Sequence, residues 1–176
     1  MATMNLITMM NRAWDDRQSL SPDRLEEIVK NLLSHAHVNY DRVLRANGYP
    51  EDKAFYVFQD ILVFIALSDG DFLQGEYDAY VKYCNWAGIH PLSVDNCRAL
   101  YKRTTTDRVA DDISLLKSYR YHIDEDKYTA LVYACCLLSL LGDKQFDENE
   151  YYIIRCFFDS SVDYCPSTWE QFKIEW

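Results

Sequence analysis

Four carboxylate residues stand at matching places in two copies of one short pattern. The first copy, from Asp69, reads Asp-Gly-Asp-Phe-Leu-Gln-Gly-Glu-Tyr, and the second, from Asp143, reads Asp-Lys-Gln-Phe-Asp-Glu-Asn-Glu-Tyr. Both follow Asp-x-x-Phe-x-x-x-Glu-Tyr, so Glu76 and Glu150 occupy the same position in each copy. Such recurrence predicts one supersecondary unit that occurs twice, here a helix–loop–helix unit.

These carboxylates have the chemistry of cation ligands if the two copies converge in space. Like charges about 4 Å apart repel by roughly 4 kcal/mol at an effective dielectric near 20, so a cluster of them holds a proton or binds a cation. Oxygen ligands without His or Cys favour Ca²⁺, Mg²⁺ or Mn²⁺ over Zn²⁺. We therefore predict a metal site formed by Asp69, Glu76, Asp143 and Glu150, with Asp71 and Asp147 as possible additional ligands.

A purely structural account explains the same residues without a metal. Asp69 and Asp143 would form turns with nearby backbone amides, as Asp often does in loops. Asp147 and Glu150 have the spacing of a capping box at a helix start. Phe72 and Phe146 would fill the core. The spacing alone leaves both accounts open, although it excludes an EF-hand, whose alternating ligand positions are missing.

Both copies follow an apolar run, Ile61–Leu67 in one case and Leu131–Leu141 in the other. These runs predict two buried helices, because apolar residues occur on all their sides. Asp69 and Asp143 then stand at helix C-termini, where an exposed carboxylate is disfavoured by roughly 0.3–1 kcal/mol. Because this unfavourable interaction with the helix dipole occurs at both sites, we expect each carboxylate to have a compensating partner.

Helical spacing and capping signals continue along the rest of the chain, and no run alternates with a period of two. We expect one all-α domain over residues 1–176, a compact bundle of about 8–9 helices that contains two pseudo-symmetric repeats at about 54–88 and 127–160. The expected helices lie within 1–18, from Pro22 to Asn47, from Glu51 to Leu67, and from Gly75 to Trp86. Further helices begin near Ser93, Thr106, Asp124, Asp147 and Ser167.

Composition narrows the choice of partner and compartment. The formal charge of −10 argues against nucleic acid and against an electrostatic hold on anionic lipid. No apolar run is long enough to span a membrane, and the first ten residues lack the pattern of a signal peptide. The six cysteines form no Cys-x-x-Cys motif, which is typical of reduced thiols in a core. We expect a cytoplasmic protein.

Both copies and their flanks, roughly residues 54–88 and 127–160, resemble the TerB-like family of tellurite-resistance proteins. The residues that carry the resemblance are Ala66-Leu67-Ser68-Asp69-Gly70-Asp71-Phe72, followed by Gly75-Glu76. Ser68 stands where the family usually has Ala, and Lys144 stands where it favours Gly. The resemblance implies an all-helical fold with two such units and an acidic cation-binding patch formed by Asp69, Glu76, Asp143 and Glu150.

The resemblance also implies a kind of function. TerB-like proteins are non-catalytic parts of stress-response systems, often linked to membrane-associated complexes. We therefore expect an accessory or sensor module that binds a divalent cation (Ca²⁺, Mg²⁺ or Mn²⁺), uses no organic cofactor and has other proteins as partners. A tellurite-specific role would be an analogy at the level of the fold.

Two other functional classes compete with this interpretation. An enzyme is disfavoured, because His35, His37, His90 and His122 form no visible nucleophile–base–orienter set, although a metal-dependent hydrolase is conceivable. A plain interaction scaffold without metal is the other class. It would use an exposed aromatic face comprising Tyr77, Tyr80, Tyr83, Tyr119, Tyr121, Tyr151 and Tyr152, unless these residues wrap the core.

The adjacent Cys135 and Cys136 raise one more possibility, a reaction with oxyanions. An apolar setting would raise the pKa of a thiol and reduce its reactivity.

Overall fold

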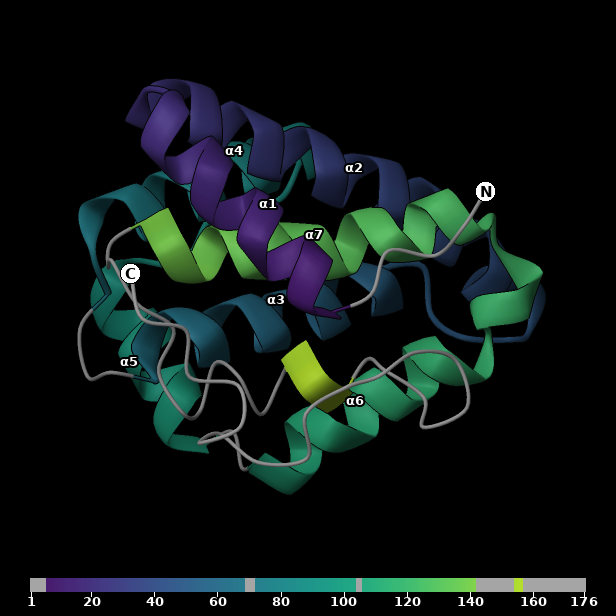
Figure 1. The fold of residues 1–176 in the computed structure, drawn as a ribbon. Helices are drawn as coiled ribbons and strands as arrows, with labels where there is room; N and C mark the ends of the chain where they lie inside the picture. Colours follow the sequence, from purple (N-terminus) through teal and green to yellow (C-terminus); the bar gives the residue numbers. More distant parts are fainter. Residues whose placement is uncertain (1–5, 69–71, 104–105, 142–153, 157–176) are drawn as a thin grey trace.

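The computed structural model describes residues 6–68, 72–103, 106–141 and 154–156 (Figure 1). Within these ranges all regular structure is helical, which confirms the predicted all-α class. The elements are α1 (Leu6–Ser19), α2 (Pro22–Ala46), α3 (Lys53–Leu67), α4 (Gln74–Ala87), α5 (Val94–Arg103), α6 (Thr106–Ser118), the 3₁₀ helix η1 (Arg120–His122) and α7 (Glu125–Leu141).

Local signals set the ends of α2 as the sequence predicts. The Ser21 hydroxyl accepts a hydrogen bond from the backbone N–H of Arg24 over 3.3 Å, and Pro22 occupies the first helical position. Proline costs little there, because that N–H has no partner within a helix. The helix ends at Ala46, and Gly48 follows with a φ of 86°, a left-handed conformation that suits glycine.

The following helices also begin and end near their predicted residues. α4 ends before Gly88, whose φ of 72° makes it a left-handed C-cap. α5 is capped by the Ser93 hydroxyl, which accepts from the Asn96 N–H over 3.2 Å. Residues 154–156 are helical and fall inside the helix predicted from Asp147. The rest of that helix and the helix predicted at Ser167 lie outside the described residues.

Two nearly apolar helices, α3 and α7, form the centre of the fold (Figure 1). α2 packs along α7 and α4, α1 covers α7, and α5 and α6 pack on α3. Every residue of α3 from Val57 to Leu67 is buried, which confirms the predicted central helix. Removal of this apolar surface from water is the main stabilising contribution to the bundle.

Two tyrosines of the possible exposed aromatic face, Tyr80 and Tyr83, are buried in the structure. Tyr80 and Tyr83 are only 1% and 0% exposed, and both hydroxyl groups bond within the protein. Tyr80 donates to the Gln59 side chain over 2.8 Å and accepts from the Leu92 N–H over 3.1 Å. These tyrosines fill the core, because their hydroxyl groups find protein partners there. Tyr121, by contrast, is largely exposed.

No helix in the described part of the chain is both long and apolar enough to cross a membrane. The two-repeat interpretation is described only in part. α3 and α4 lie within the first predicted repeat, and α7 lies within the second, so the repeat itself stays a prediction.

Candidate functional site

The two central helices end at the same side of the molecule. α3 and α7 pack against each other, and both helices run toward the side where α4 begins (Figure 1). A β-carbon at Gly75, the second residue of α4, would lie 3.3 Å from the carbonyl oxygen of Leu141, the last residue of α7. The chain therefore leaves α7 directly beside the start of α4.

Glu76 is the one predicted metal ligand that lies within the described residues. Its side chain is buried, with 1% of the residue exposed, and Oε2 accepts the N–H of Leu73 over 2.9 Å. This bond satisfies an amide that the first turn of α4 would leave unpaired, so Glu76 has the capping role of the structural account. Phe72 packs edge-on against Tyr77 and is half-buried.

The remaining predicted ligands are Asp69, Asp71, Asp143, Asp147 and Glu150, which all lie outside the described residues. Within the described ranges no three His, Cys, Asp or Glu side chains are grouped as metal ligands. The four-carboxylate site therefore stays a prediction. What is described is the side of the fold at which α3 and α7 both end.

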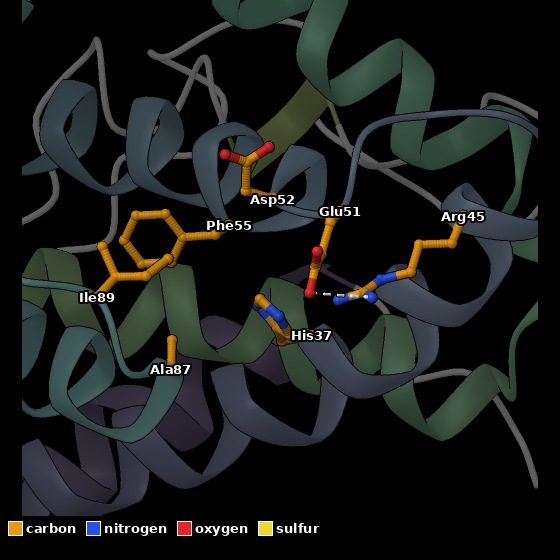
Figure 2. A pocket seen from close by; sticks show the side chains of 7 residues that line it. All are labelled: His37, Arg45, Glu51, Asp52, Phe55, Ala87 and Ile89. Atoms are coloured by element: carbon orange, nitrogen blue, oxygen red, sulfur yellow. Dashed lines mark ion pairs between the residues drawn. The ribbon is translucent and has the colours of Figure 1, made fainter.

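A pocket of about 350 Å³ lies between α2, the start of α3 and the end of α4 (Figure 2). Phe55 and Ile89 form an apolar side, whereas Arg45 and Glu51 face each other across the opposite side. Their Nη1 and Oε1 atoms are 3.4 Å apart. The complete lining is His37, Arg45, Glu51, Asp52, Phe55, Ala87 and Ile89.

His37 is fixed in this pocket by contacts behind the ring. Its Nδ1 lies 2.7 Å from the hydroxyl oxygen of Tyr83, and the ring meets the rings of Phe58 and Trp86 edge-on. Burial lowers the pKa of His37, an effect partly opposed by the nearby Asp41 carboxylate. The imidazole is therefore neutral at pH 7.

A second hollow, of about 340 Å³, is lined by Trp86 and by residues of α2. Val38 and Trp86 are 57% and 41% exposed there, between α2 and α4. Lys30, Asn31, Ser34, His35 and Asn39 complete the lining. We call this the Trp86 groove. His35 and His37 line different hollows, as expected for two residues about 200° apart around a helix.

A buried carboxylate pair lies between α3 and α6, and the sequence pattern did not predict it. Asp60 is 5% exposed and accepts from Arg108 Nη2 over 2.9 Å. Asp112 lies within hydrogen-bonding reach of Asp60. Burial is the main cause that raises the pKa of Asp112 to about 7, and the neighbouring Asp60 is the second cause. The available signal was one acidic residue, next to Gln59, within the apolar sequence of α3.

No family model, curated protein or solved structure matches the chain. The TerB-like resemblance therefore stays a prediction from the sequence.

Proposed function

We propose that the protein is a non-catalytic, TerB-like accessory or sensor module that binds a divalent cation at the side where α3 and α7 end. The observation that carries the proposal is the contact between Gly75 and the Leu141 carbonyl oxygen. Each Asp-x-x-Phe segment starts within two residues of α3 or α7, so this contact supports convergence of the two copies.

The proposed ligands are Asp69 and Glu76 from one copy and Asp143 and Glu150 from the other. Oxygen ligands of this kind favour Ca²⁺, Mg²⁺ or Mn²⁺. A bound cation would offset the repulsion between the carboxylates and the unfavourable position of Asp69 and Asp143 at helix C-termini. Cation binding would thereby couple the two halves of the bundle, which is the property required of a sensor that presents a surface to other proteins.

Calorimetric titration of chelator-treated protein with each of the three cations tests this proposal. We expect saturable binding to the wild type and none to an Asp69→Asn/Asp143→Asn variant that still folds. Asp124→Asn/Asp126→Asn is the matched control, because it removes the same charge at the opposite end of the 17-residue α7, about 24 Å away. Absence of heat and of thermal stabilisation with all three cations would overturn the proposal.

A scaffold that binds protein without metal is the second candidate, and the Trp86 groove supports it. Exposed tryptophan beside an apolar neighbour is typical of interface centres. A partner protein that is isolated with the wild type and then purified should bind the wild type again. It is expected not to bind a Trp86→Ala/Val38→Ser variant. Retained binding by this variant would rule out the groove as the interface.

A further inference from the structure

The His37 pocket combines an apolar side with groups of both charges. Phe55, Ala87 and Ile89 line one side, and Arg45 and Glu51 line the other (Figure 2). The volume of about 350 Å³ is at the low end of ligand sites, so the pocket suits a small molecule. None of its residues belongs to the proposed cation site.

The Tyr83 hydroxyl determines which nitrogen of His37 carries the proton. Tyr83 is fully buried, and burial raises the pKa of its hydroxyl well above the usual value, so the group remains a donor. Within the described chain its acceptor is Nδ1 of His37, 2.7 Å away. A buried hydroxyl without an acceptor would cost about 1–3 kcal/mol, so Tyr83 donates to Nδ1. The neutral ring then carries its proton on Nε2.

The Nε2–H group is consequently a hydrogen-bond donor on the edge of the ring away from Tyr83. Among the described residues no acceptor engages it. A ligand that offers an oxygen acceptor beside His37 would complete the bonding of the ring.

Arg45 has donor capacity left over as well. Its Nε donates to Asp41 Oδ1 over 2.8 Å, and its Nη1 faces Glu51. Asp41 and Glu51 are the partners of Arg45 among the described residues, and they engage its Nε and Nη1 atoms. Arg45 is thus able to bind an anionic oxygen while it keeps its partner on α2.

The carboxylate of Glu51 supplies the opposite charge beside Arg45, whereas the Asp52 carboxylate points away from this pair (Figure 2). A simple anion would be attracted by Arg45 and repelled by Glu51, whereas a simple cation would be attracted by Glu51 and repelled by Arg45. A zwitterion with its charges a few ångströms apart can pair with the positive and the negative side chains at the same time. Electrostatic complementarity of this kind gives specificity.

We propose that this pocket binds a free α-amino acid with an apolar side chain. The ligand carboxylate accepts from Arg45 and from His37 Nε2–H, and its ammonium group lies against the Glu51 carboxylate. Its side chain packs on Phe55 and Ile89. The protein would then respond to an amino acid at a site separate from the cation site.

Titration of the folded protein with L-leucine, followed by NMR and calorimetry, tests this inference. The two analogues are 3-methylbutylamine, which lacks the carboxylate, and 4-methylpentanoate, which lacks the ammonium group. We expect saturable binding of leucine and about tenfold weaker binding of each analogue, because each analogue lacks one of the two charged groups that the pocket would bind. Equal binding of either analogue, or no binding of leucine at millimolar concentration, would overturn the inference.

Two surface substitutions locate the site. Arg45→Gln is expected to abolish leucine binding, whereas Arg42→Gln, an exposed arginine on the same helix outside the pocket, is expected to leave it unchanged. Retained binding by Arg45→Gln would contradict the proposed pose. Cation titration of Arg45→Gln should match the wild type, so failure of this inference remains distinguishable from failure of the proposed function.

Discussion

Arg108 donates from Nη2 to Oδ2 of Asp60 over 2.9 Å, and this ion pair joins α6 to the central helix α3. Asp60 is almost fully buried, so its charge depends on this partner. Asp112 lies beside the pair, and its Oδ2 is shielded from solvent without a hydrogen-bond partner in the described chain. Two ionised carboxylates only accept, so a hydrogen bond between Asp60 and Asp112 requires a proton on one of them.

The Asp60–Asp112 pair predicts a stability that falls as the pH rises. Burial and Asp60 raise the pKa of Asp112 to about 7, while Lys53 and Arg108 oppose the shift. The folded protein therefore holds this proton more tightly than the unfolded chain. The contribution of Asp112 is full below about pH 4 and is lost as the pH rises to about 7, with a slope of up to about 1.4 kcal/mol per pH unit.

Asp112→Asn is expected to remove this slope and to raise the free energy of unfolding at pH 7, because an amide donates to Asp60 at any pH. Urea unfolding of wild type and variant at pH 4 to 8 measures the difference. Asp111→Asn, at the exposed neighbouring position, is the control and should retain the wild-type slope. Parallel pH profiles for Asp112→Asn and wild type would contradict the assignment.

The close approach of Gly75 to Leu141 predicts intolerance to larger residues at position 75. Gly75→Val adds atoms beyond a β-carbon that already lies 3.3 Å from the Leu141 carbonyl oxygen. We expect a loss of about 1–3 kcal/mol in the free energy of unfolding, the usual cost of an overpacked contact. Asn85→Val, on the exposed face of the same helix, should change stability by less than about 0.5 kcal/mol. Equal unfolding midpoints for both variants would show that α4 and α7 are not in this contact.

The environment of His37 predicts that its imidazole has a lower pKa in the folded protein than in the unfolded chain. Burial lowers its pKa, so the contribution of the neutral ring to stability is present above about pH 6.5 and is lost as the pH falls below it. NMR titration of the labelled ring, folded and in urea, should give the lower midpoint in the folded protein. The ¹⁵N shifts should also place the proton on Nε2. A folded-state midpoint at or above the unfolded one would refute this account.

The cysteines on α7 predict very low thiol reactivity. Cys135 and Cys136 are fully buried, and burial raises the pKa of Cys135 to about 12 and that of Cys136 well above its usual value. A thiol in this state presents almost no nucleophilic thiolate at neutral pH. Iodoacetamide at pH 8 should leave both residues unmodified in the native protein and modify both in urea, as read by mass spectrometry. Rapid native modification of either thiol would reopen the oxyanion hypothesis.

The sequence by itself determined the helices and their ends. Ser21-Pro22, Gly88 and Ser93 act within three or four residues along the chain, so their capping roles follow from composition and spacing alone. The apolar character of α3 and α7 likewise follows from the residue pattern, because a helix without a polar face has to be buried.

Only the tertiary structure decided which distant residues meet. His37 and Tyr83 are 46 positions apart, and Asp60 and Arg108 are 48 apart, so no local rule brings them together. Helix crossing angles and the fit of side chains between helices place them in contact. The same packing puts Gly75 beside Leu141, whereas the sequence left open whether the two repeated motifs converge. Capping is a property of one helix, but a pocket or an ion pair between helices is a property of their arrangement.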